Sequence, residues 1–464
     1  MTGHRFDPTV LREYDIRGVV GETLGAKDAR AIGRSFATVL RRAGGGKLAV
    51  GYDGRLSSPM LEQALVEGVM AGGVDVVRIG MGPTPMLYYA EASAEDVDGG
   101  VQVTGSHNPA DHNGFKLVLQ GRPFFGADIS ALGRMAAAGD WLGGAGHCDN
   151  REVLPAYVER LLTGLDGIDA GWLAALRIGW DAGNGATGPA IERLVQRLPG
   201  EHHLLYTDVD GHFPNHHPDP TEERNLADLK ALVADKRLDF GIAFDGDGDR
   251  IGVVDGEGRV IWGDQLLAIH AEDVLRRLPG ATVIGDVKMS RALFDGVAAL
   301  GGAPLMWKSG HSHIKSKMKE TGAPLGGEMS GHLFFADDYY GFDDALYAAI
   351  RLIAASCRIG RSVTELRAAA PALVNTPELR FQVDEARKFA VIDEVRGRLA
   401  AAGAPANDID GVRVLTEDGW WLLRASNTQD MLTARAESGD HAGLARLLGE
   451  IDAQLAASGL SRSG

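Results

Sequence analysis

The sequence predicts an α/β protein made of three similar domains and a smaller, fourth α+β domain. A chain of 464 residues has room for about three or more domains at roughly 150 residues each. One pattern of strand, turn and helix occurs three times before residue 367, and a different pattern follows it. We therefore expect domains at residues 1–150, 151–254, 255–367 and 368–464.

The repeated pattern is an apolar run, an Asp, a turn rich in Gly or Ser, and a helical segment. It occurs at residues 48–65, 176–194 and 281–300. The apolar runs are short and almost continuous, which is typical of strands buried on both faces of a parallel sheet. Pro59 and Pro189 stand near the expected first helical turns, where proline is favoured. A thrice-repeated α/β unit is the economical interpretation, and chance similarity among common α/β patterns is the alternative.

Each copy of this pattern is followed by a second loop of unusual composition. These loops span residues 103–109, 244–250 and 326–332. Ligands of α/β proteins gather at the carboxyl ends of strands, where we expect these loops to lie. The three loops are therefore candidates for the functional site.

The chain beyond residue 367 has the pattern of a small α+β domain. Pro371 and Pro377 interrupt the first segment, which we interpret as a linker. The expected elements are strands at 379–383 and around 431–436, helices at 385–402 and 441–457, and a hairpin that turns at Asp418-Gly419.

Composition and charge exclude several classes of function. The chain has 63 Asp and Glu against 47 Lys and Arg, a formal charge of −16, so we expect no nucleic-acid or anionic-lipid partner. Cys148 and Cys357 cannot form a disulfide framework. The most apolar helical stretch, at 345–357, is too short to span a bilayer. These observations predict a cytoplasmic protein that does not enter the membrane.

The loop Asp-Gly-Asp-Gly-Asp-Arg is the strongest candidate for a metal site. Asp245, Asp247 and Asp249 stand at alternate positions after an apolar strand. The glycines between them let the chain curl so that the carboxylates converge, and such oxygen ligands favour Mg²⁺ or Ca²⁺. An EF-hand does not fit, because the sixth position is Arg250 and the twelfth is Gly256. An acidic, solvated turn is the alternative.

A candidate nucleophile lies in the loop Thr-Gly-Ser-His-Asn-Pro. We expect Ser106 to present an exposed hydroxyl on a turn that Asn-Pro fixes, with His107 beside it as a potential proton carrier. Lys116 follows in an apolar strand, where a buried ammonium requires a partner. The chain has no Gly-x-Ser-x-Gly motif, so an α/β-hydrolase is not expected. A loop that only turns the chain is the alternative.

Two further loops suit the hydroxyls and the phosphate of a phosphorylated sugar. In an extended loop, Glu328, Ser330 and His332 would face the same way and suit sugar hydroxyls. The groups that suit a phosphate are Arg424, Ser426, Asn427 and Thr428. Taken alone, either loop has an ordinary polar turn as its alternative. With one such loop in each domain, we expect an enzyme that acts on a phosphorylated polyol.

Taken together, these motifs resemble the α-D-phosphohexomutase family over essentially the whole chain and in the same order. The matching segments are YDIRG at 14–18, TGSHNP at 104–109, DGDGDR at 245–250, GEMSGH at 327–332 and RASNT at 424–428. The resemblance implies three similar α/β domains with mixed sheets and a smaller α+β domain, arranged in the shape of a heart around a central cleft.

The resemblance also implies a reaction. Ser106 resembles the phosphoserine that gives its phosphoryl group to a hexose 1- or 6-phosphate. The resulting hexose 1,6-bisphosphate would turn around in the cleft and return its other phosphate to the serine. Mg²⁺ would be bound by Ser106, Asp245, Asp247 and Asp249. Four residues resemble those that lie near the transferring phosphate in the family: Tyr14, Arg17, His107 and Lys116. The resemblance leaves open which of them accepts the proton of the sugar hydroxyl.

The remaining matched residues would bind the substrate. Glu328 and Ser330 resemble the pair that binds the O3 and O4 hydroxyls of the sugar. Arg250 would bind the phosphoserine or the bisphosphate. The other implied contacts are Lys288, His311 and His332 for the sugar phosphate, and Arg424, Ser426, Asn427 and Thr428 for the distal phosphate.

The GEMSGH loop, with Met329, resembles the phosphomannomutase/phosphoglucomutase branch of the family. A loop that reads O3 and O4 does not read C2, where mannose and glucose differ, so we expect phosphates of both sugars as substrates. Phosphoglucosamine mutase is the closest alternative, and a Mg²⁺-dependent sugar phosphatase or a non-catalytic sugar-phosphate-binding protein are the others. We expect a monomer, with a dimer as the alternative, and a fourth domain that hinges over the cleft.

Overall fold

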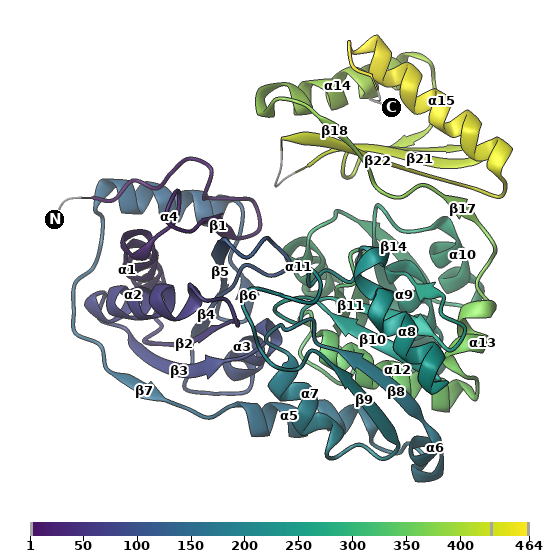
Figure 1. The fold of residues 1–464 in the computed structure, drawn as a ribbon. Helices are drawn as coiled ribbons and strands as arrows, with labels where there is room; N and C mark the ends of the chain where they lie inside the picture. The colour runs from purple at the N-terminus through teal and green to yellow at the C-terminus, as the bar shows by residue number, and fades with distance from the viewer. Residues whose placement is uncertain (1–2, 427–429, 462–464) are drawn as a thin grey trace.

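The computed structural model describes residues 3–426 and 430–461 and contains four sheets, each built from one continuous part of the chain (Figure 1). Three α/β domains and a smaller α+β domain follow one another, as the sequence predicts. Within the part of the chain that is described, no helix combines the length and the apolar character needed to cross a membrane.

The first domain has a mixed sheet covered by helices. Its elements are β1 (Ile16–Val19), α1 (Ala26–Arg42), β2 (Lys47–Tyr52), α2 (Ser58–Ala71), β3 (Asp75–Met81), α3 (Thr84–Ala92), β4 (Gly99–Val103), β5 (His112–Leu119), β6 (Arg122–Pro123), α4 (Ala127–Ala138) and β7 (Cys148–Asn150). The strand order is β1-β5-β4-β2-β3-β7, with β6 beside β5. β2 pairs in parallel with β3 and β4, whereas β5 is antiparallel to β4.

The second domain repeats this plan with fewer strands. Its elements are α5 (Leu154–Leu162), η1 (Thr163–Leu165), α6 (Ala170–Ala175), β8 (Arg177–Asp181), α7 (Gly188–Val195), β9 (Glu201–Leu205), η2 (Glu223–Leu226), α8 (Ala227–Lys236), β10 (Phe240–Phe244), β11 (Ile251–Asp255) and β12 (Val260–Ile261). β8 pairs in parallel with β9 and β10, and β11 is antiparallel to β10. Because β12 pairs with β11, this sheet extends past the expected boundary at residue 254.

The third domain has the same arrangement again. Its elements are α9 (Gly263–Arg277), β13 (Thr282–Asp286), α10 (Arg291–Ala299), β14 (Ala303–Trp307), α11 (His311–Thr321), β15 (Leu325–Gly327), β16 (Leu333–Phe335), α12 (Ala345–Ile359) and α13 (Val363–Ala368). β13 pairs in parallel with β14 and β15, and β16 is antiparallel to β15. The three expected repeat strands β2, β8 and β13 thus occupy equivalent places among parallel neighbours.

The fourth domain is an antiparallel sheet covered by two long helices. Its elements are β17 (Val374–Asn375), β18 (Leu379–Gln382), α14 (Glu385–Ala401), β19 (Ala406–Asn407), β20 (Val412–Thr416), β21 (Gly419–Ala425), β22 (Met431–Ser438) and α15 (His441–Ala457). β20 and β21 form the hairpin expected at Asp418-Gly419. This domain has its own apolar core, and Figure 1 shows it above the third domain and away from most of the first.

The candidate loops take the same place in the first three domains. In the first three domains, each loop joins a strand with a parallel neighbour to the antiparallel strand that follows it: β4 to β5, β10 to β11, and β15 to β16. In the fourth domain the corresponding loop joins the antiparallel strands β21 and β22. The fold therefore places one chemically distinct loop at an equivalent sheet position in each of the first three domains, and the fourth loop at the end of an antiparallel pair of strands.

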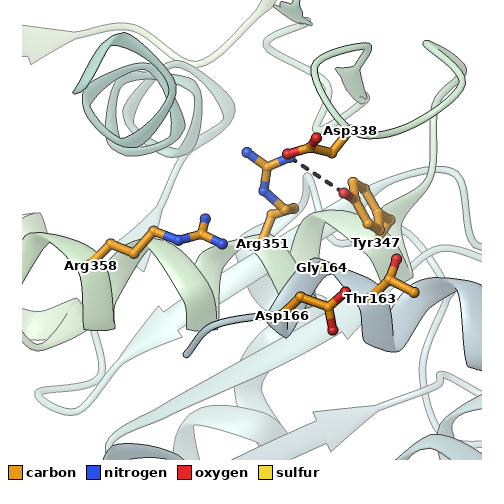
Figure 2. A pocket seen from close by; sticks show the side chains of 7 residues that line it. All are labelled: Thr163, Gly164, Asp166, Asp338, Tyr347, Arg351 and Arg358. Atoms are coloured by element: carbon orange, nitrogen blue, oxygen red, sulfur yellow. Dashed lines mark hydrogen bonds between the residues drawn. The ribbon is translucent and has the colours of Figure 1, made fainter. Parts of the chain in front are cut away.

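Helix α12 holds the second and third domains together. Most of its residues are buried, and it packs against α9 of its own domain and against α5, η1 and β11 of the second. Arg351 on this helix is 2 % exposed and donates two 2.8 Å hydrogen bonds to the Asp337 carboxylate. It lines a cavity of about 290 Å³ between the helix and η1 (Figure 2). A charged group at this boundary is therefore held by a buried ion pair.

Arg351→Ala is expected to destabilise the protein by about 3 kcal/mol. Breaking a buried ion pair costs about 3–5 kcal/mol, and the lower value applies because Arg277 also contacts Asp337. Arg276→Ala, which removes an exposed pair with Glu272 on α9, should cost less than about 1 kcal/mol. Urea unfolding of both variants measures the difference, and equal losses would contradict the assigned role of Arg351.

Candidate active site

Ser106 lies in the turn between β4 and β5 and faces the second domain. Its Oγ donates a 2.7 Å hydrogen bond to Oδ2 of Asp245. The residue is 2 % exposed, so the prediction that its hydroxyl is exposed is wrong. The hydroxyl is buried because the loop that carries Asp245 packs over it. Its backbone φ of +49° is in the left-handed region, which a residue with a side chain rarely adopts.

The three aspartates of the second domain converge as expected. Asp245, Asp247 and Asp249 are each 0 % exposed, and one carboxylate oxygen from each lies within 4.8 Å of the others. The turn depends on its glycines. Gly248 has a φ of +75°, and a Cβ on Gly246 would come within 2.5 Å of the Ser106 carbonyl oxygen. The glycines of the Asp-Gly repeat thus let the backbone turn tightly at Gly248 and let it approach the serine loop closely at Gly246.

Lys116 on β5 supplies the positive charge of this cluster. Its Nζ donates to Oδ2 of Asp247 at 2.7 Å and also to Oδ2 of Asp249. Burial lowers the pKa of Lys116, but the two carboxylates outweigh burial and hold the pKa above its ordinary value. The structure therefore gives this buried ammonium the partners that it requires, and they come from another domain.

The aspartate cluster has the chemistry of a site for a hard cation. Oδ1 of Asp247 and Oδ1 of Asp249 are buried and make no hydrogen bond to any described residue. Burial and the two neighbouring carboxylates raise the pKa of Asp245 well above its ordinary value. Three carboxylates and one ammonium leave an excess of negative charge, so a divalent cation fits the donor set.

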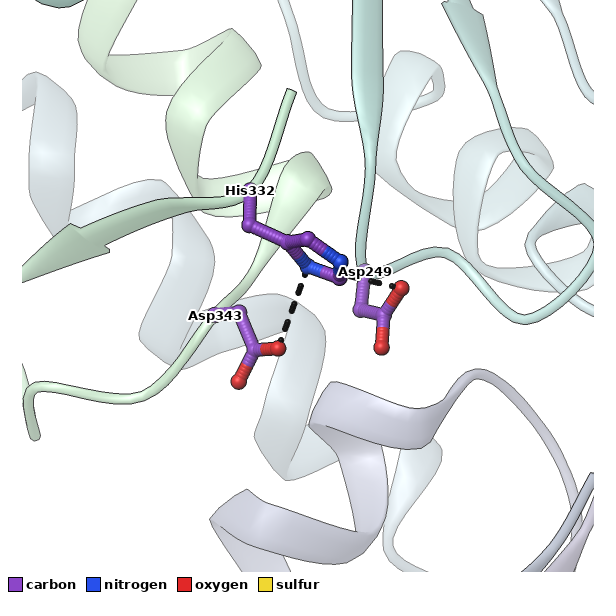
Figure 3. Close-up of side chains that lie close together, drawn as sticks. All are labelled: Asp249, His332 and Asp343. Atoms are coloured by element: carbon purple, nitrogen blue, oxygen red, sulfur yellow. Dashed lines mark ion pairs between the residues drawn. The ribbon is translucent and has the colours of Figure 1, made fainter. Parts of the chain in front are cut away.

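His332 of the third domain contacts the aspartate loop of the second (Figure 3). Arg250 donates through Nε to Nε2 of His332 at 3.1 Å, so the proton of a neutral imidazole is on Nδ1. That nitrogen lies 3.2 Å from Oδ2 of Asp343 and 3.6 Å from Oδ1 of Asp249. His311 at the start of α11 stacks on the imidazole at 5.5 Å between ring centres. Two expected substrate residues are thus brought together.

The GEMSGH loop is a tight turn rather than the extended loop that we expected. Glu328 donates from its backbone N–H to the His332 carbonyl, and Gly331 has a φ of +87°, because β15 and β16 are joined directly. The Glu328 side chain is 3 % exposed and accepts a 2.6 Å hydrogen bond from the Gly310 N–H. Burial raises its pKa. Ser330 is half-buried in the same turn.

Polar contacts extend from these loops to the fourth domain. Tyr14 donates to the Ser309 carbonyl at 3.0 Å, and the Ser309 N–H donates to Asp410 at 3.1 Å. Asp410 in turn lies 3.0 Å from the guanidinium of Arg424. Lys288 also reaches the fourth domain, where its ammonium lies 3.7 Å from the Glu378 carboxylate. Ser426, another expected residue, is buried directly after β21. Asn427 and Thr428 lie outside the described residues.

Family models match nearly the whole chain. They are described as the α/β/α domains I, II and III and the C-terminal domain of phosphoglucomutase/phosphomannomutase, and they match residues 8–141, 155–258, 262–373 and 378–454. The chain belongs to the phosphoglucomutase/phosphomannomutase family. Its four candidate loops fall one in each of the four matched domains.

Relatives in this family cover almost the same length. A phosphomannomutase/phosphoglucomutase of Pseudomonas aeruginosa is 43% identical over 95% of this chain and 94% of its own. A phosphoglucomutase of Neisseria meningitidis is 40% identical over 96% of both chains. The crystal structure of a phosphoglucomutase/phosphomannomutase family protein from Burkholderia thailandensis superimposes with a TM-score of 0.92, at 43% identity and 99% coverage of both chains.

Several residues outside the family motifs of the sequence also contact the site. Thr84, at the start of α3, donates a 2.5 Å hydrogen bond to Asp247, and Asp219 lies 3.1 Å from His107. Lys315 donates to Asp343 at 2.8 Å. These contacts cross between elements far apart in the chain, so the sequence carried no local signal for them.

The serine loop also positions the expected proton carrier and an arginine. Arg17 on β1 donates a 2.6 Å hydrogen bond to the side-chain oxygen of Asn108. The Nδ1 of His107 lies 3.1 Å from Asp219. Burial, followed by the positive charge of Arg250, lowers the pKa of His107 to about 3 despite the opposing effect of Asp219. His107 is therefore a neutral imidazole near neutral pH.

The imidazole of His107 is expected not to titrate between pH 8 and pH 5. In the unfolded chain its pKa is about 6.5, so the unfolded state takes up this proton first, and protonation destabilises the fold as the pH falls below about 6.5. Histidine NMR spectra of the protein and of His107→Gln assign the signal and follow it with pH. A titration midpoint near 6.5 in the folded protein would contradict the assigned environment.

Proposed function

We propose that this protein is a phosphohexomutase, an isomerase that moves a phosphoryl group between O1 and O6 of a hexose. The substrates are mannose and glucose phosphates. The observation that supports this most directly is the 2.7 Å contact of a buried serine hydroxyl with a cluster of three aspartates. The names of the relatives from Pseudomonas aeruginosa and Neisseria meningitidis agree with the proposal.

In the proposed reaction, Ser106 carries the phosphoryl group in the resting enzyme. A sugar hydroxyl attacks the phosphorus, the bond from phosphorus to the serine Oγ breaks, and a hexose 1,6-bisphosphate forms while the hydroxyl proton passes to a base. The bisphosphate turns around and returns its other phosphoryl group to Ser106. Lys116 contacts the aspartate loop and Arg17 contacts the serine loop, so both provide positive charge near the transferring group. Arg250 follows Asp249 directly and adds a third positive charge from the aspartate loop itself.

The proposed metal is Mg²⁺, held by Asp245, Asp247, Asp249 and an oxygen of the phosphorylated Ser106. Bound there, the cation would neutralise negative charge on the transferring phosphoryl group. Oδ1 of Asp247 and Oδ1 of Asp249, which are buried and make no hydrogen bond to a described residue, support this assignment. Lys116 keeps two of the carboxylates in place from the first domain, so the donors are positioned by two domains at once.

The loops of the third and fourth domains suit a substrate that binds in two orientations. The proposed roles are contact with O3 and O4 for Glu328 and Ser330, and binding of the non-reacting phosphate by Arg424 and the loop after it. O3 and O4 are nearly symmetric when the sugar turns end for end, and one phosphate site then serves both orientations. Hydrolysis of a sugar phosphate requires only one binding orientation. A site that suits both orientations therefore favours a mutase over a sugar phosphatase.

Ser106→Ala is expected to abolish conversion of both mannose 1-phosphate and glucose 1-phosphate to the 6-phosphates. The loss should exceed about 1,000-fold, since removing a nucleophile eliminates the covalent route. The assay contains Mg²⁺ and a trace of hexose 1,6-bisphosphate, and Ser130→Ala on the exposed face of α4 is the control. Release of inorganic phosphate without any 6-phosphate would show a phosphatase and overturn the proposal.

Asp247→Asn is expected to weaken Mg²⁺ binding by at least about tenfold, because loss of even an outer-sphere partner typically costs that much. Calorimetric titration of the protein with MgCl₂ measures the change without any substrate. Asp166→Asn, at an exposed position after η1, is the matched control. Equal Mg²⁺ affinity of both variants and the parent protein would contradict the metal assignment.

A further inference from the structure

Arg55 is a buried arginine that contacts the backbone of the serine loop and belongs to none of the five segments that match the family. Its side chain is 0 % exposed. Nη2 donates to the carbonyl oxygens of Ser106 at 2.7 Å and Asn108 at 2.6 Å. Nη1 donates to the carbonyl oxygens of Pro109 at 2.5 Å and His112 at 3.0 Å. One guanidinium therefore binds four carbonyl groups between Ser106 and the start of β5.

Asp53 fixes both Arg55 and the first residues of the loop. Its Oδ2 accepts hydrogen bonds from Thr104 Oγ1 at 2.9 Å and from the Gly105 N–H at 3.0 Å, and it lies 3.3 Å from Nε of Arg55. Its Oδ1 accepts a hydrogen bond from the backbone N–H of Arg55 at 3.0 Å. The Asp-Gly-Arg turn of the first repeat thus binds the serine loop along its whole length.

The loop needs this support because its central residue is strained. Ser106 has a φ of +49°, a left-handed conformation that is strained for a residue other than glycine. Such a conformation persists only where the surroundings determine it, and Arg55 binds the carbonyl group of this same residue. Gly105 leaves space for the guanidinium, since a Cβ there would lie 2.4 Å from Nε of Arg55.

We propose that Arg55 is a positioning residue for phosphoryl transfer. It holds the strained serine loop in the one conformation that places the Oγ of Ser106 at 2.7 Å from Asp245. Lysine cannot replace it, because an ammonium lacks the planar fork that serves four carbonyls at once. The inference rests on the proposed function, since the step that Arg55 supports is transfer to and from Ser106.

The test compares Arg55→Lys with Arg351→Lys, which changes an equally buried arginine far from the serine loop in the chain. For Arg55→Lys we expect kcat of the mutase reaction to fall by about 100-fold, the loss that a misplacement of about 1 Å causes, with KM within about threefold. The phosphorus NMR signal of the phosphoserine should broaden or split. For Arg351→Lys we expect a lower Tm, with kcat within about twofold of the parent and one sharp signal. Arg351 pairs with Asp337 and Asp273, which belong to none of the candidate loops.

Gly105→Ala provides the second variant in case Arg55→Lys does not fold. Its added methyl group displaces the guanidinium without removing it, so kcat should fall to a similar extent. Parent-like kcat and NMR signal in either folded Arg55→Lys or Gly105→Ala would overturn the inference, as would an equal loss of kcat in Arg351→Lys. Failure of the parent protein to interconvert the hexose phosphates would instead overturn the proposed function itself.

Discussion

The site depends on a buried cluster of charge between the first two domains. Asp245, Asp247 and Asp249 lie fully out of solvent, where three carboxylates repel one another unless cations join them. Lys116 supplies one positive charge from the neighbouring domain, and the remaining excess of negative charge suits a divalent ion. Ser106 donates a hydrogen bond to the same cluster. The contacts that join the first two domains therefore also fix the position of the candidate nucleophile.

The repeated architecture explains how four unrelated loops come to act together. Each of the first three domains places its loop between a strand with a parallel neighbour and the antiparallel strand that follows. One structural plan therefore presents the Ser106 hydroxyl, the aspartate cluster and the tight turn at Glu328. Direct contacts then connect the loops. Ser106 reaches Asp245, Arg250 reaches His332, and Ser309 and Arg424 meet at Asp410. Polar contacts therefore link each candidate loop to a neighbouring domain, from the first domain to the fourth.

The sequence predicted the parts of this site that local spacing determines. The Asp-Gly alternation predicted converging carboxylates, and the buried position of Lys116 predicted a charged partner. Other features depend on packing between distant segments and left no local pattern. The burial of Ser106, the tight turn at Glu328 and the contacts of Asp343 belong to this class. Arg55 stands in the first repeat beside Asp53, but only the folded loop shows that it binds four carbonyls.

The proposed reaction requires that Ser106 pass its phosphoryl group to a sugar. A single-turnover experiment tests it directly: Ser106 is phosphorylated with a labelled phosphoryl group and mixed with unlabelled glucose 1-phosphate and Mg²⁺. The proposed transfer predicts that the label leaves the protein and appears at O6 of the sugar, first in the 1,6-bisphosphate and then in the 6-phosphate. Label that appears only as inorganic phosphate, or that stays on the protein, would contradict it.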